Sequence, residues 1–196
     1  MSSQYIVKIK TQMLQFRNCL IGLLMAMTVT SQAIAQSGAE RESQERWTKA
    51  VDAYKKGDKD NSVPYFLIAA AAGLPDGAHA MGVVYEEGTV VPQNSKLAMK
   101  FFTCNAETGY LRSQLKLMRL YEDGVLVPKN LGEAYFWALI ASSNAPGSSS
   151  SDIEYRNAIV MLRNGLAKKV GVATAEKIQK KAQAWKPVIK ECYFKN

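Results

Sequence analysis

The chain has 196 residues, which is enough for one domain or for one domain with appendages. Hydrophobic residues make up 47% and charged residues 21%, close to the globular average, so a disordered chain or a collagen-like fibre is excluded. The net charge is +8, with one histidine, His79, and three cysteines. A single histidine argues against most His-based metal and catalytic sites, and three cysteines cannot build a cysteine-rich scaffold.

The first 35 residues have the pattern of a cleaved signal peptide. Lys8, Lys10 and Arg17 supply positive charge. An 11-residue apolar stretch, Cys19 to Val29, follows these basic residues, and it is short for a membrane span. Ala33-Ile34-Ala35 then forms an A-x-A cleavage signal. We therefore expect residues 1–35 to be removed, leaving no integral membrane anchor.

Cleavage after Ala35 gives a mature chain that begins at Gln36 in the periplasm, an oxidising compartment. Either Met1 or Met13 fits the signal as its start. The mature chain keeps 22 of the 25 basic residues and all 17 acidic residues, a net charge of +5. Ten of those basic residues fall within 156–196. Export argues against a nucleic-acid partner for this basic C-terminal region. Two interpretations remain: the region binds an acidic partner, or its lysines and arginines form a solvated helix face.

The chain then repeats itself with a period of 36 residues. Such a period is typical of a solenoid made of helix pairs. A less regular unit precedes the two clear copies and contains Tyr54 and Gly57. The recurring positions are Gly73, Tyr85, Gly88, Val91, Pro92, Asn94, Ala98 and Phe101, which return as Gly109, Tyr121, Gly124, Val127, Pro128, Asn130, Ala134 and Trp137.

Each repeat reads as two helices joined by a loop, and residues 40–54 are expected to form the first helix of the array. Within 77–88, Met81 and Tyr85 share one helical face. Gly88 is expected to end that helix, because only glycine enters a left-handed cap without penalty. Asn94 is expected to cap the next helix. The aromatic residues of both helices are interpreted as core packing.

These residues resemble the Sel-one-like repeat (SLR) family, a relative of the tetratricopeptide repeat. The resemblance covers roughly residues 46 to 145, and Met118 departs from it by replacing a helix glycine. It implies an all-α fold, an α/α solenoid of helix-turn-helix repeats over 36–145. The family pattern is met by Met81-Gly82, Tyr85, Gly88, Val91, Asn94, Leu97-Ala98, Phe101-Phe102, Ala106 and Gly109. The second copy meets it more loosely, at Ser113, Leu117, Tyr121, Gly124, Val127, Asn130, Ala134, Trp137, Ala141 and Gly147.

Residues 146–196 are expected to form a linker and a pair of capping helices. Gly147 to Ser151 marks a loop, and Asp152 is expected to cap the helix that follows. A solenoid's last repeat exposes apolar surface that needs a cover. Two apolar stripes would provide it: Ile159, Leu162 and Leu166, and then Ala175, Ile178, Ala182 and Trp185.

The sequence offers no catalytic motif, so we expect no enzyme activity, no catalytic residues, no metal and no cofactor. The paired carboxylates Glu86-Glu87 and Glu122-Asp123 stand beside helix-ending glycines, where carboxylates are usually solvated. There is no phosphate loop, metal-ligand spacing or nucleophile elbow.

The family resemblance implies a protein partner. A periplasmic adaptor or regulator is the leading hypothesis, with an envelope receptor as one kind of partner. The alternative is an immunity-type inhibitor that neutralises a secreted toxin or effector, as in type VI secretion. A β-lactam-binding or hydrolysing enzyme is a remote alternative, because the regular cysteine pairs of such family members are absent here. The oligomeric state stays open.

Two cysteines remain in the mature chain, Cys104 and Cys192. An even count in an oxidising compartment predicts a disulfide between them, with Cys192 near the end of the last helix. The alternative is that Cys104 is a small apolar filler.

The binding surface is expected in the concave groove lined by the first helices of successive repeats. It would use the faces opposite Tyr54, Tyr85 and Tyr121. Val83 and Leu115 are apolar there with Arg119 between them, a make-up typical of a binding hot spot; the alternative is that neighbouring helices cover both. The predicted groove residues are Thr48, Asp52, Lys55, His79, Val83, Glu86, Leu115, Arg119 and Glu122.

Overall fold

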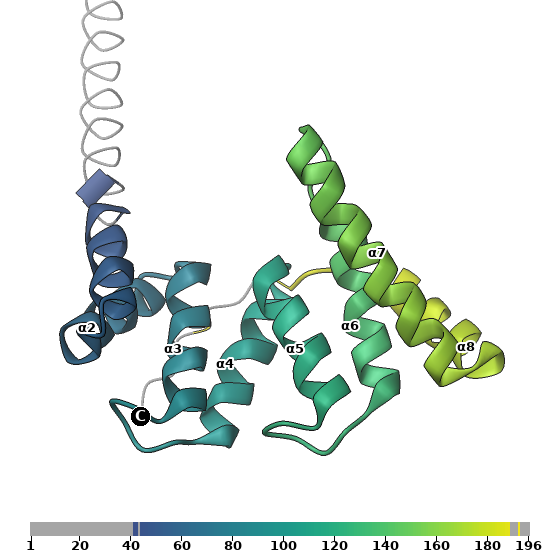
Figure 1. Cartoon of the computed structure of the whole chain (residues 1–196), viewed down its shortest axis with the longest axis horizontal. Coiled ribbons are helices and arrows are strands. Elements are labelled where there is room, and N and C mark those ends of the chain that lie inside the picture. Colours follow the sequence, from purple (N-terminus) through teal and green to yellow (C-terminus); the bar gives the residue numbers. More distant parts are fainter. Residues whose placement is uncertain (1–40, 43, 189–191, 193–196) are drawn as a thin grey trace, which may run out of the picture. The chain divides into compact units, whose positions relative to one another are not determined.

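The computed structural model describes residues 41–42, 44–188 and 192, so the predicted signal peptide lies outside the described residues. The chain divides into two units, 1–46 and 47–196, and the second carries the repeats. The described residues contain helices and no strand (Figure 1). Residues 44–55 are helical, and the helices that follow are α2 (Lys59–Ala71), α3 (Pro75–Glu87), α4 (Ser95–Glu107), α5 (Leu111–Asp123), α6 (Leu131–Asn144), α7 (Ser150–Val170) and α8 (Val172–Gln183).

Each helix from α2 to α7 packs against the next one in the chain, and α8 packs against α6 and α7. This is the consecutive packing of a helix-pair solenoid, as predicted. The first helices of the pairs are the helix over 44–55, α3, α5 and α7, and the second helices are α2, α4, α6 and α8. Among the described residues, none of the helices is both long and apolar enough to cross a membrane.

The predicted helix ends are confirmed in both clear repeats. Gly88 ends α3 in the left-handed conformation, with a φ of 65°. Asn94 caps α4 by accepting a hydrogen bond from the backbone N–H of Leu97 at 3.0 Å. The backbone N–H of Asn94 also donates to the carbonyl of Tyr85 at 2.9 Å, which closes the loop. Gly124, Asn130 and Tyr121 repeat this arrangement at α5 and α6. The same separation of the tyrosine and the asparagine in both repeats therefore allows the same hydrogen bond to close the loop.

The start of α7 differs from the prediction. Ser149, and not Asp152, is the N-cap. The Ser149 hydroxyl accepts from the backbone N–H of Asp152 at 3.2 Å, and the Asp152 carboxylate accepts from the backbone N–H of Ser149 at 3.1 Å. Such a capping box needs a short hydroxyl-bearing side chain at the N-cap and a side-chain acceptor three residues later. Ser149 and Asp152 meet both needs, so the helix begins within the serine-rich segment 148–151.

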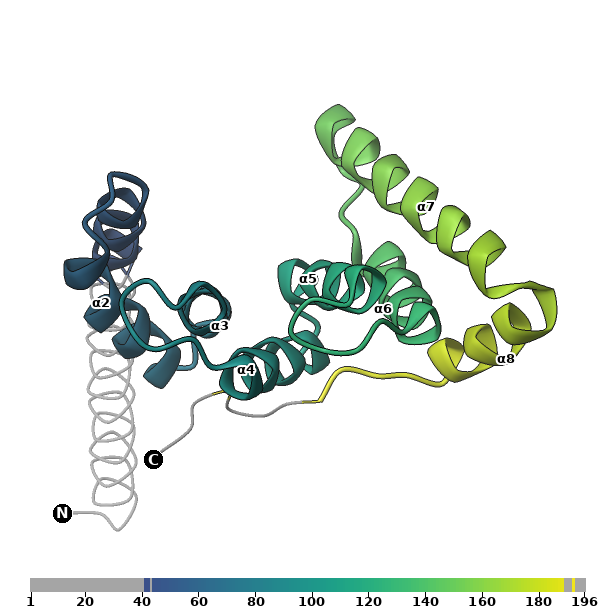
Figure 2. The same ribbon diagram turned by 60° about the horizontal axis from the view of Figure 1, so that its bottom comes forward.

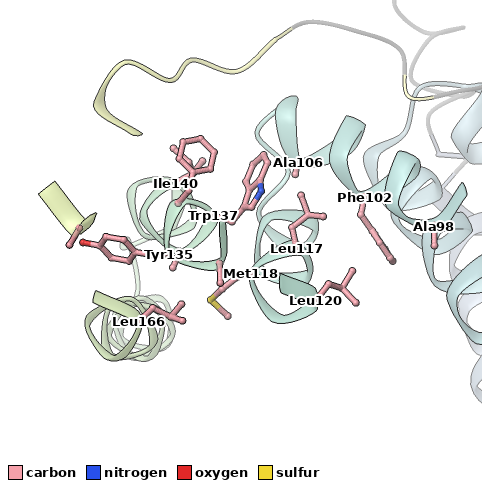
Figure 3. Close-up of a cluster of buried hydrophobic side chains, with 14 residues drawn as sticks. Ala98, Phe102, Ala106, Leu117, Met118, Leu120, Tyr135, Trp137, Ile140 and Leu166 are labelled. Carbon is pink, nitrogen blue, oxygen red and sulfur yellow. The ribbon is translucent and has the colours of Figure 1, made fainter. Parts of the chain in front are cut away.

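The main core lies between α4, α5, α6 and the C-terminal helices (Figure 3). Phe102 and Leu117 are fully buried, and Trp137 is 6% exposed, which confirms their predicted packing role. Tyr135 points from α6 toward α8, where its hydroxyl accepts a hydrogen bond from Gln179 at 2.8 Å. The second C-terminal stripe packs on this core as predicted; it consists of Ala175, Ile178, Ala182 and Trp185.

The first C-terminal stripe is only partly correct. Ile159 and Leu166 are buried, but Leu162 is 43% exposed. The two buried residues are seven positions apart and thus lie on one face of α7, which contacts α6. Leu162 is three residues from one and four from the other, on the edge of that face, where α6 does not cover it.

Cys104 and Cys192 form a disulfide with a Cα–Cα distance of 5.5 Å. Cys192 does not belong to a helix, contrary to the expectation, because α8 already ends at Gln183. Residues 185–188, which follow α8, are not helical and lead toward α4 (Figure 2), where the backbone N–H of Val188 donates to the carbonyl of Glu107 at 2.8 Å. The disulfide therefore joins the C-terminal segment to the second helix of a central repeat.

Candidate functional site

A pocket of about 200 Å³ lies on the face formed by the first helices. We call it the aromatic pocket. The helix over 44–55 and α3 supply most of its lining, while α2 and α5 supply one residue each. The lining residues are Trp47, Val51, Tyr54, Lys55, Phe66, Asp76, His79, Ala80, Val83 and Arg112.

Aromatic side chains form one wall of the pocket. Trp47, Val51 and Tyr54 are spaced by four and three residues, so they share one face of their helix. The ring of Phe66 lies 5.4 Å from the Trp47 ring and 5.6 Å from the Tyr54 ring, both in tilted contacts. The Tyr54 hydroxyl donates to Glu87, whose carboxylate also accepts from Lys59 at 2.8 Å. Burial, followed by the Glu87 contact, raises the pKa of Tyr54.

His79 stands in the opposite wall and is held by a buried polar network. Its Nδ1 lies 2.9 Å from the hydroxyl of Ser113. The Asn105 side-chain amide donates to that same hydroxyl at 3.0 Å and to the carbonyl of Pro75 at 2.8 Å. The His79 ring also packs 5.4 Å from the ring of Phe102. These contacts fix the orientation of the imidazole.

The surroundings keep His79 uncharged at neutral pH. Burial lowers its pKa to about 4, and the positive charges of Arg112 and Lys116 act in the same direction. Asp76 acts in the opposite direction and has the smallest effect of these groups. Its carboxylate accepts from the Tyr110 hydroxyl and lies 3.7 Å from Arg112. The His79 ring is thus uncharged, and the nearby charges of Arg112 and Lys116 make the electrostatic potential around it positive.

The structure brings three predicted groove residues together in the aromatic pocket: Lys55, His79 and Val83. Thr48 and Asp52 lie on the same helix as Lys55, are exposed, and are not part of the lining. That helix turns Trp47, Val51 and Tyr54 toward α3, so the face that lines the pocket is rotated by about one residue from the predicted one.

The other predicted residues lie outside this pocket. Glu86 pairs with Lys116 at 2.6 Å. Leu115 is partly buried against two core clusters, and Val83 also packs partly against the main cluster. Arg119 is exposed on α5. Glu122 pairs with Lys169 of α7 at 2.6 Å.

Seven lining residues were not predicted for the groove: Trp47, Val51, Phe66, Arg112, Asp76, Ala80, and Tyr54, which was predicted for the core. The first two carried a usable signal, because together with Tyr54 they form an apolar stripe of helical spacing that has no earlier repeat to pack against. Phe66 and Arg112 carried none, since one lies on a second helix and the other enters the pocket from the edge of α5.

The pocket has the make-up of a binding site more than of a catalytic one. Its walls are largely apolar, with a few polar groups at set positions, as in recognition pockets. Ser113 and His79 are hydrogen-bonded, but Ser113 is fully buried, so a substrate cannot reach its hydroxyl. The described residues contain no group of three or more His, Cys, Asp or Glu side chains placed to hold a metal ion.

Neither a family model nor a curated protein matches the chain. A solved structure does: the crystal structure of a protective antigen present in uropathogenic Escherichia coli strains, which displays an SLR fold. The TM-score is 0.59 at 18% sequence identity, over 73% of this chain and 29% of that chain. This chain therefore spans less than a third of its neighbour's length. With the repeated loops and the consecutive helix packing, this likeness shows that the chain adopts the all-α Sel-one-like repeat fold.

Proposed function

We propose that this chain is an exported, non-enzymatic interaction module that acts in the periplasm as an adaptor or regulator and binds its partner protein on the first-helix face. The observation that carries the proposal is the aromatic pocket, which places Trp47, Tyr54 and Phe66 around a hollow between two first helices. Aromatic residues in a partly desolvated pocket are the usual anchors of protein interfaces. Lys55 and Arg112 supply the polar edge that such anchors need.

Two features support export. The basic start, the short apolar stretch and the A-x-A signal that ends at Ala35 are typical of a signal peptide. The Cys104–Cys192 disulfide fits an oxidising compartment, because reducing systems keep most cytosolic cysteines as thiols.

The intact mass of the protein recovered from periplasmic extract tests the export step. We expect a chain that begins at Gln36 and lacks two hydrogens because of its disulfide. A full-length chain found in the cytosolic fraction would contradict the proposal.

Cross-linked capture from periplasmic extract, followed by mass spectrometry, tests the binding step. We expect the unmodified protein to capture a partner that Val83→Phe captures at least about tenfold less, because the added ring fills the pocket. Val172→Phe is the matched control, since Val172 is 78% exposed on α8 and lies outside the pocket. If the unmodified protein, Val83→Phe and Val172→Phe captured the partner equally, the pocket would not be part of the interface.

The captured partner also separates the two functional classes. A receptor or a component of an envelope assembly would support the adaptor. A secreted toxin whose activity the chain blocks would replace the adaptor with the immunity-type inhibitor.

A further inference from the structure

The direction of one hydrogen bond at the pocket wall can be derived from the network behind it. The Asn105 side chain donates to the carbonyl of Pro75, so its nitrogen faces that side, and the same nitrogen donates to the hydroxyl oxygen of Ser113. The Ser113 hydroxyl proton then has one acceptor within reach among the described residues, Nδ1 of His79. Ser113 is fully buried, and a buried hydroxyl proton without an acceptor is costly. His79 Nδ1 therefore accepts, and the ring carries its proton on Nε2.

The Nε2–H group of His79 is available to a ligand. Ser113 is the hydrogen-bond partner that the structure gives the ring, through Nδ1. No buried side-chain nitrogen or oxygen of the described residues lacks a hydrogen-bond partner, so Nε2 must reach the accessible surface. His79 lines the aromatic pocket, which makes Nε2–H a fixed donor beside apolar walls. A donor in such surroundings favours a ligand that brings an acceptor.

The positively charged side chains at the rim of the pocket, Lys55 and Arg112, also favour a ligand that carries hydrogen-bond acceptors, in this case negatively charged ones. Lys55 is exposed, and none of the ion pairs between described residues includes it. The Arg112 side chain is 70% exposed, with most of its donors unused by Asp76. The nearby carboxylates are already engaged: Asp76 by Tyr110, and Glu87 by Tyr54 and Lys59. The rim can therefore accept additional negative charge from a ligand.

The size of the pocket limits what can enter. Small-molecule and cofactor pockets typically measure about 300–1,000 Å³. The aromatic pocket, at about 200 Å³, is smaller and suits one bulky apolar side chain. The rest of such a ligand must lie on the surface around the pocket.

We propose that the aromatic pocket binds a partner segment that inserts one bulky apolar side chain and carries a carboxylate side chain next to it. The apolar side chain packs among Trp47, Tyr54 and Phe66. A backbone carbonyl of the segment accepts from Nε2–H of His79, and the carboxylate pairs with Lys55 or Arg112. This inference rests on the proposed function and specifies the chemistry of its partner.

Short peptides test this chemistry directly. The probes are Gly-Glu-Phe-Glu-Gly, Gly-Lys-Phe-Lys-Gly and Gly-Glu-Ser-Glu-Gly, acetylated and amidated, titrated into the purified protein at low ionic strength and followed by amide NMR shifts. We expect the first peptide to bind at least about tenfold more tightly than the other two and to shift signals of the pocket residues. The proton on Nε2 of His79, the one histidine of the chain, should shift with them.

Matched variants separate charge from packing. Lys55→Glu should lower the affinity for the Glu-Phe-Glu peptide about fivefold. It should also reduce the difference in affinity between this peptide and the lysine peptide. Lys177→Glu, the same charge change at an exposed lysine of α8, should alter its affinity less than about twofold. Val83→Phe should abolish binding, whereas Val172→Phe should not.

Three outcomes would overturn the inference: equal or tighter binding of the lysine peptide, equal binding of the serine peptide, or no binding of any peptide up to about 5 mM. The proposed function would survive each of these if a periplasmic partner still lost capture on Val83→Phe. It would fail separately if capture did not depend on the pocket.

Discussion

Gly82 of α3 lies directly against the ring of Phe102 of α4: a methyl group added to Gly82 would stand 2.5 Å from Cε1 of that ring. One period later, α5 carries Met118 and α6 carries Ala138 at the corresponding positions, and both are buried in the main core. The large residue has thus moved from the second helix of the pair to the first. This exchange of volume explains why Met118 can depart from the family pattern without disturbing the packing.

A double-mutant cycle tests the exchange. Gly82→Met should overpack the contact, and Phe102→Ala should leave a cavity that costs about 3–5 kcal/mol of unfolding free energy. The combined variant copies the Met118–Ala138 arrangement, so its loss should be smaller than the sum of the single losses by at least about 1 kcal/mol. Urea unfolding measures all four proteins. Strictly additive losses would contradict the account.

The disulfide should contribute strongly to stability, because it closes a loop of 88 residues in sequence. Cys192→Ser should lower the free energy of unfolding by about 2–4 kcal/mol in the chain-entropy view. Chemical unfolding with and without reductant measures the effect, and the Cys192→Ser protein serves as the control for the reductant. Equal stability of the oxidised and reduced proteins would show that the cross-link adds nothing.

The protein should lose stability as the pH falls through the range where His79 titrates. Its pKa is lowered in the folded state from 6.5 to about 4. Above pH 6.5 the ring is neutral in both states. Between about pH 6.5 and 4 the unfolded state binds a proton that the folded state does not, so acid favours unfolding, by about 1–2 kcal/mol at pH 5.

Urea unfolding at pH 7 and pH 5 checks this effect. His79→Asn removes the titrating group and keeps an acceptor for Ser113, so its stability should change less between the two pH values. The same pH dependence in both proteins would assign it to other groups.

Arg119 tests whether the interface extends along α5 beyond the pocket. The side chain is exposed and lies two helical turns from Arg112 on the same face. Arg119→Glu should weaken partner binding by more than about 2 kcal/mol if the face is continuous, and should change thermal stability by less than about 0.5 kcal/mol. Calorimetric titration with the captured partner and a thermal melt measure the two quantities. Unchanged affinity would confine the interface to the pocket.

Helix ends could be predicted from the sequence because they depend on neighbours in the chain. Gly88 takes the left-handed conformation and Asn94 reaches an N–H three residues on, whatever packs around them. Ser149 and Asp152 show the limit of this reasoning, because either residue can cap a helix and they lie three positions apart. Their reciprocal hydrogen bonds make Ser149 the N-cap of α7 and Asp152 its partner in the first turn.

The pocket could not be predicted in the same way, because its lining depends on contacts between distant residues. Tyr54 was expected in the core, and it does pack there partly, but its hydroxyl bonds Glu87 of α3, 33 residues away, and its ring lines the pocket. The tautomer of His79 likewise depends on Ser113, 34 residues away. The helical periodicity of a sequence shows which residues share a face of one helix. It does not show which other helix packs against that face.

Site-specific photo-crosslinking in the periplasm tests the central claim most directly, namely that the partner docks in the aromatic pocket. A photoreactive phenylalanine analogue replaces Asp52, which is exposed beside the pocket on the helix over 44–55, or, as the control, the exposed Val172 of α8. The account predicts a discrete partner adduct from position 52, lost when Val83→Phe fills the pocket, and none from position 172. An adduct at position 172 with none at position 52, or an adduct at position 52 that Val83→Phe leaves unchanged, would contradict it.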